Sequence, residues 1–98
     1  MLRITKVFDD GEEVVMKLEG KMIGVWVSEL ESICLFHRDE LNKIVVLDFS
    51  GVTFIEEKGL RMLKDLKDER VKIVNCSPFI YSLLDKFISR DNGSRNEH

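Results

Sequence analysis

The segment from Lys43 to Leu66 constrains the fold of this chain more than any other stretch. It opens with Ile44–Leu47, a short apolar run rich in β-branched residues, and such a run is typical of a strand buried on both faces. Polar residues and a glycine at 48–51 then predict a break in the strand. A short apolar step at 52–55 follows, and leucines recur at helical spacing from residue 60 to 66. We therefore predict a strand, a loop and a helix, and in open α/β sheets ligands and partners meet at such strand-to-helix ends.

The residues before this segment predict a β-hairpin and a helix. Residues 2–8 have the loose alternation of an edge strand, and 14–18 have the pattern of its returning partner. Between them, the Asp-Asp-Gly sequence at 9–11 is typical of a tight turn. Ser28 begins a capping-box sequence, in which a serine oxygen and a glutamate three residues later satisfy the first backbone N–H groups, and this predicts a helix from Glu29 to Arg38.

The residues after the central segment predict a second parallel strand and a last helix. The strand is expected at Val71–Val74. Ser77 and Pro78 suit the N-cap and the first helical position, and the apolar stripe that follows predicts a helix ending near residue 89 or 90. The polar residues 91–98 predict a flexible C-terminal tail.

Together these patterns predict one α/β domain over residues 1–90. The order is strand, strand, helix, strand, helix, strand, helix, or ββαβαβα. Helices between strands imply crossover connections, and so a mixed, mostly four-stranded sheet with a parallel portion and about three helices. A length of 98 residues is enough for a single modest core.

Composition excludes several classes of function. A net charge of −3 gives no electrostatic reason to expect a nucleic acid as partner. No apolar run approaches the roughly 18 residues of a membrane span, and residues 1–10 have no apolar signal core. We therefore expect a soluble, cytoplasmic protein without membrane insertion. Cys34 and Cys76 are too few and too isolated for a disulfide framework, and we expect buried or inert thiols.

No constellation of residues indicates catalysis. The sequence has no phosphate-binding glycine loop of the usual patterns, no nucleophile beside a credible histidine base, and no Cys/His cluster with metal spacing. His37, near a helix end, is expected to be structural. The adjacent Glu56 and Glu57 point in different directions at a helix start, so they suit the helix macrodipole better than a shared-proton pair. We expect no enzyme, no cofactor and no metal.

The order and spacing of these motifs resemble the STAS domain, the fold of bacterial anti-sigma-factor antagonists and of the cytoplasmic tails of sulfate transporters. The resemblance covers roughly Thr5–Ile88. Its strongest part is Val45–Ile55, an apolar strand followed by Asp48 and a short step toward the helix. Gly59 and Leu60 match the family's helix-opening Gly-Leu. The resemblance implies a STAS-like fold with the element order given above.

Three of four positions before the helix depart from the family pattern. Members that switch partners carry Asp-Ser-Ser-Gly or a close variant there, and one of those serines takes phosphate from a cognate kinase that is also the anti-sigma factor. Here the same positions are Glu56-Glu57-Lys58-Gly59, and neither central position has a hydroxyl. The resemblance therefore implies a regulator without the usual phosphoacceptor serine. Whether Ser50 or Thr53 is modified stays open.

Three functions fit the resemblance. The first is a protein-binding regulatory module that docks an anti-sigma factor or a kinase-like regulator through Glu56–Arg61. The second is a soluble accessory subunit of a membrane transporter, and the third is a module that binds a nucleotide or a lipid. A homodimer is possible in each case. For the first function, the expected partner-binding residues are Asp48, Ser50, Glu56, Glu57, Lys58, Gly59 and Arg61.

Overall fold

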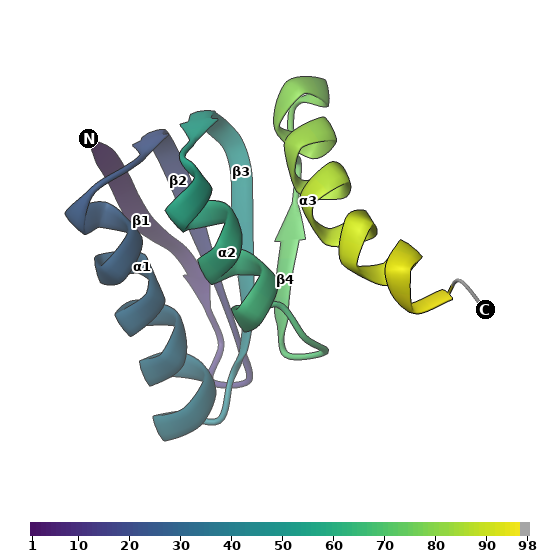
Figure 1. The fold of residues 1–98 in the computed structure, drawn as a ribbon. Helices are drawn as coiled ribbons and strands as arrows, with labels where there is room; N and C mark the ends of the chain where they lie inside the picture. The colour runs from purple at the N-terminus through teal and green to yellow at the C-terminus, as the bar shows by residue number, and fades with distance from the viewer. Residues whose placement is uncertain (97–98) are drawn as a thin grey trace.

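A computed structural model describes residues 1–96 and contains one four-stranded sheet with helices on one side (Figure 1). The strands are β1 (Leu2–Asp9), β2 (Glu13–Met22), β3 (Ile44–Ile55) and β4 (Val71–Val74), and they lie in this order across the sheet. β1 pairs antiparallel with β2, whereas β2 with β3 and β3 with β4 are parallel pairs. The predicted mixed sheet is confirmed, and β2 is longer than the 14–18 strand that we predicted.

The helices are α1 (Val25–Leu35), the π-helical turn η1 (Phe36–Glu40), α2 (Glu57–Leu66) and α3 (Pro78–Asn96). α1 and α2 cover one face of the sheet, and α3 packs against α2 and β3 on the β4 side (Figure 1). A helix connects each pair of parallel strands, as crossover connections require. The predicted single α/β domain and its order ββαβαβα are confirmed.

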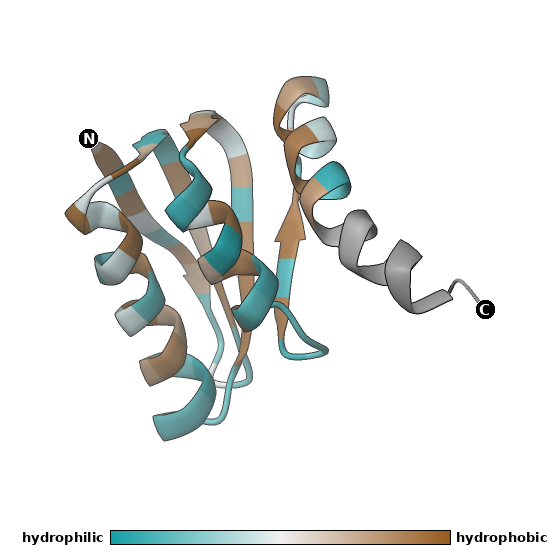
Figure 2. Cartoon of the chain, in the orientation of Figure 1, coloured by the Kyte–Doolittle hydropathy of each residue, from teal (hydrophilic) through white to brown (hydrophobic). Residues whose placement is uncertain are grey.

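Side chains along the central strands alternate between the core and the opposite face of the sheet. On β3, Val45, Leu47 and Phe49 are buried, whereas Asp48 is half-buried and Ser50 is exposed. Figure 2 shows hydrophilic residues along the outward side of α2, because its apolar side chains turn toward the sheet. Among the helix residues whose burial the structure describes, the buried apolar ones are Val27, Leu30, Cys34, Met62, Leu63, Leu66, Ile80 and Leu84.

The predicted break within residues 44–55 is wrong. β3 continues through 48–51 as one element of 12 residues. Gly51 lies opposite Glu19 of β2, and a Cβ added at this glycine would stand 2.9 Å from the Leu18 carbonyl oxygen. The glycine therefore permits a close approach of two strands and does not end one. Pairing with β2 overrides the local turn tendency of the sequence.

The predicted start of the first helix is also wrong. Its N-cap is Gly24, with φ 59°, and Ser28 lies inside α1 and not at its cap. Glycine adopts a positive φ without steric cost, so the chain turns from β2 into α1 at this residue. The α-helix ends at Leu35, and η1 continues to Glu40. The helix predicted at 29–38 is therefore correct in place and wrong at both ends.

The start of α3 matches the prediction. The Ile80 N–H donates a hydrogen bond of 3.2 Å to Ser77 Oγ, and Pro78 is the first helical residue. The helix runs to Asn96, so the predicted end near residue 89 or 90 is wrong. The flexibility of residues 91–98 stays a prediction, and residues 97–98 lie outside the described part of the chain.

Candidate functional site

The carboxyl ends of three parallel strands meet the N-termini of three helices at one edge of the sheet. β2 leads into α1, β3 into α2 and β4 into α3 (Figure 1). The first turn of each helix leaves backbone N–H groups without intrahelical partners and carries a partial positive charge. Ligands and partners of open α/β sheets bind at this edge. The predicted Glu56–Arg61 segment lies there, at the start of α2.

Glu56 connects the start of α2 to the start of α1. It is the N-cap residue of α2, and its carboxylate Oε2 accepts a 2.6 Å hydrogen bond from the Gly24 N–H. Its own N–H donates to the Met22 carbonyl oxygen, at 3.2 Å, where β2 ends. One oxygen of this carboxylate is therefore committed to the fold, and Glu56 acts as a brace between two helix starts.

Glu57, Lys58 and Arg61 lie exposed on the first turns of α2. Arg61 donates a 2.7 Å hydrogen bond to Glu57, and the two side chains remain 65% and 68% exposed. Within the described residues, Lys58 forms no ion pair with a carboxylate. An exposed pair one helical turn apart contributes only about 0.3–0.5 kcal/mol. All three charged groups are therefore available to a partner at little cost to the fold.

Gly59 belongs to the packing beneath these charges. It is buried, and an added Cβ would stand 2.9 Å from Ile55 Cγ2 and 3.3 Å from Met22 Sδ. Only a hydrogen at this position lets α2 begin so close to the ends of β2 and β3. The structure thus places Gly59 behind the exposed charges.

Asp48 and Ser50 lie on β3, on the face of the sheet opposite the helices. The Ser50 N–H donates a 2.9 Å hydrogen bond to Asp48 Oδ1. This bond, followed by side-chain hydrogen bonds from Ser50 and Asn75, lowers the pKa of Asp48. A strand advances about 3.3 Å per residue, so Ser50 lies up to about 20 Å before Glu56. The structure therefore divides the predicted partner-binding residues between two surfaces.

Two exposed apolar side chains near the strand-to-helix connections escaped the sequence analysis. Val25, the first residue of α1, is 74% exposed, and Phe54, near the end of β3, is 42% exposed. Val25 follows Gly24, whose N–H binds Glu56, whereas Phe54 pairs with the exposed Lys21 of β2 and lies two residues before Glu56. The pattern of apolar runs does not distinguish them from core residues. The available signal was Gly24, whose positive φ starts α1 there.

The remaining candidate residues are the two cysteines and His37, and their surroundings are those of structural groups. Burial raises the pKa of the Cys34 thiol to about 12, and partial burial also raises the pKa of Cys76; both thiols are free. His37 Nδ1 lies 2.9 Å from the Ile33 carbonyl oxygen. Among the described residues, no three potential metal ligands gather at one place. Within that same part of the chain, no helix combines the length and apolar character that crossing a membrane requires.

Comparisons with known proteins agree with this architecture. The model of the STAS domain family matches residues 3–91. No curated protein sequence matches the chain. Among solved structures, the anti-sigma factor antagonist SpoIIAA in its unphosphorylated form aligns with a TM-score of 0.61 at 16% identity, over 93% of this chain and 99% of that chain. The likeness to that structure shows a common fold, and the match to the family model shows that the chain belongs to the STAS domain family.

Proposed function

We propose that this STAS domain is a regulatory module without enzymatic activity that binds a protein partner at the start of α2, independently of serine phosphorylation. The partner is an anti-sigma factor or a kinase-like regulator. The observation that carries the proposal is the exposure of Glu57, Lys58 and Arg61 at the start of α2, which the bond from Gly24 to Glu56 ties to the start of α1 and its exposed Val25. Apolar contacts with polar residues around them are the usual anatomy of a protein–protein interface.

The charges of this surface define the partner's complementary surface. Residues 56–59 contain no hydroxyl group, so the surface carries no phosphoacceptor at these positions. A phosphoserine adds about 1.5–2 negative charges, whereas Glu57 supplies one permanent negative charge beside two cations, Lys58 and Arg61. We therefore expect a partner with a mixed charge pattern that includes a cation opposite Glu57. Binding of this kind needs no kinase step.

Two experiments test the proposal in sequence. A pull-down of the tagged full chain from its own source cell, followed by mass spectrometry, identifies the partner. Calorimetric titration then measures its affinity for the wild type and for Glu57→Lys. We expect Glu57→Lys to weaken binding at least about tenfold, because like charges repel across an interface. The control is Glu69→Lys, the same charge change at an exposed position beyond the end of α2.

A double variant separates the surface charge from the stability of the helix. Glu57→Arg with Arg61→Glu keeps an oppositely charged pair one turn apart and exchanges the positions of its charges. We expect it to bind as weakly as Glu57→Lys. Wild-type affinity in both variants removes the 56–61 surface from the proposal. Recovery of transporter subunits in place of a sigma-pathway protein identifies an accessory subunit instead.

A further inference from the structure

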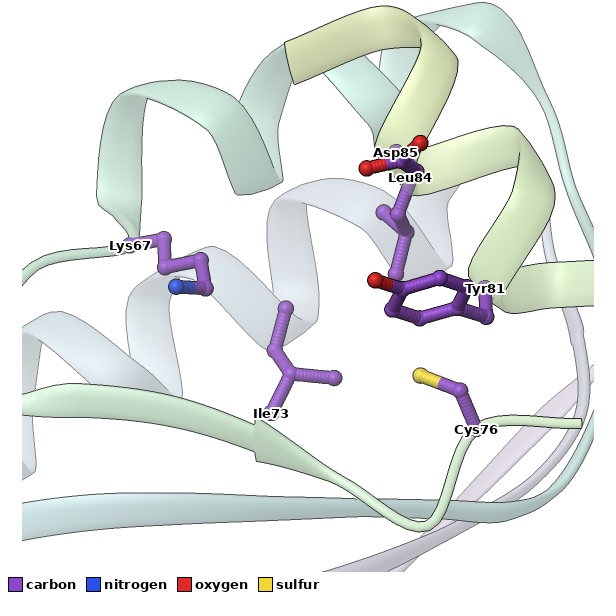
Figure 3. A pocket seen from close by; sticks show the side chains of 6 residues that line it. All are labelled: Lys67, Ile73, Cys76, Tyr81, Leu84 and Asp85. Atoms are coloured by element: carbon purple, nitrogen blue, oxygen red, sulfur yellow. The ribbon is translucent and has the colours of Figure 1, made fainter. Parts of the chain in front are cut away.

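A cavity lies between β4, the end of α2 and the first turns of α3 (Figure 3). It is at the opposite end of α2 from the proposed partner surface. Its volume is about 210 Å³. The residues that line it are Lys67, Ile73, Cys76, Tyr81, Leu84 and Asp85.

Most of the cavity wall is apolar. Ile73 points into it from β4, and Leu84 points into it from α3 (Figure 3). The ring of Tyr81 and the thiol of Cys76 close one side (Figure 3). Tyr81 is 61% exposed, so solvent also reaches its ring. A wall of this kind favours a ligand with an apolar body.

The charged residues of the wall give no net preference for an ion of either sign. Lys67 and Asp85 carry opposite charges and both line the cavity (Figure 3). Lys67 is also the C-cap residue of α2, where the end of the helix adds a partial negative charge. Lys67 attracts an anion that Asp85 and the helix end repel, and Asp85 attracts a cation that Lys67 repels, so these charges largely offset each other. An ion of either sign also loses hydration on entering a largely apolar cavity.

We infer that this cavity binds a small, neutral aromatic molecule with one hydroxyl group. Its volume lies below the roughly 300–1,000 Å³ of ordinary ligand pockets, so it is too small for a nucleotide or an extended lipid chain. The ligand ring packs against Tyr81, Ile73 and Leu84. Its hydroxyl donates to Asp85; this carboxylate has another interaction in the fold, but a carboxylate offers about four acceptor sites.

Cys76 supplies a built-in reporter of occupancy. The chain has 2 cysteines, and Cys34 is 0% exposed, so Cys76 is the thiol that a reagent reaches in the folded protein. The experiment follows alkylation of the full chain by N-ethylmaleimide with intact-mass spectrometry, with phenol as the probe ligand. Phenol in the cavity covers the thiol, so the labelling rate is expected to fall by the factor 1 + [L]/Kd, about tenfold at about ten times Kd.

Two exposed aromatic residues of α3 give a matched pair of variants. Tyr81→Ala removes one wall of the cavity and is expected to abolish most of the protection, whereas Phe79→Ala changes a residue that is 57% exposed and outside the lining, and is expected to keep it. Benzoate and benzylammonium are expected to protect less than phenol. Absence of protection by phenol, full protection in Tyr81→Ala, or stronger protection by either ion overturns the inference.

Discussion

Replacing Glu56 by alanine is expected to lower the free energy of unfolding by about 1–2 kcal/mol, and replacing Glu57 by about 0.5 kcal/mol or less. The two residues are adjacent in sequence, but Glu56 accepts a 2.6 Å hydrogen bond from the Gly24 N–H, which begins α1, whereas Glu57 accepts one from Arg61 within α2. A hydrogen bond to a charged group contributes about 1.5–3 kcal/mol net, and access of solvent to this one reduces the figure. An exposed pair within a helix contributes about 0.3–0.5 kcal/mol.

Urea unfolding followed by circular dichroism measures both variants against the wild type. In thermal unfolding of a domain of this size, 1 kcal/mol corresponds to a shift of about 4–8 °C in Tm. Glu56→Gln keeps an oxygen acceptor without the charge. Its free energy of unfolding is therefore expected to lie between those of the wild type and Glu56→Ala. Equal stability of Glu56→Ala and the wild type, or an equal loss in Glu57→Ala, would refute the assignment of Glu56 as a brace.

Two further predictions concern β1 and β3. The side chain of Lys43, 2.6 Å away, followed by the Gly11 N–H, holds the pKa of Asp9 well below its usual 3.8. This contribution to stability is present above the unfolded pKa and is lost as pH falls through the folded pKa. Asp9→Asn should therefore reduce the loss of unfolding free energy below about pH 4, measured by urea unfolding. An unchanged pH profile contradicts this. Gly51→Ala is expected to cost about 1–3 kcal/mol, because its Cβ would stand 2.8 Å from Glu19 Cγ; unchanged urea unfolding would show that β2 and β3 can separate freely.

Several local signals in the sequence predicted the elements correctly, although the capping-box sequence at Ser28 misplaced the start of α1. Leucines at helical spacing mark α2, and Ser77 with Pro78 marks the start of α3, because capping and periodicity there agree with the packed structure. The apolar run at 44–47 likewise marks the buried part of β3. The sequence failed where pairing between distant segments decides the outcome. A glycine after Ser50 is typical of a turn, but Gly51 lies within a strand because β2 pairs with it.

The sequence by itself determined the order of strands and helices and the resemblance to the STAS domain, because hydrophobic periodicity and helix-start residues act over a few neighbouring positions. The tertiary structure alone decided which candidate residues share a surface. Alternation along β3 turns Asp48 and Ser50 to the face away from the helices, and a bond to Gly24 commits Glu56 to the fold. Glu57, Lys58 and Arg61 stay exposed because their side of α2 meets solvent. These outcomes depend on which segments pack together, and local sequence carries little information about contacts between residues far apart in the chain.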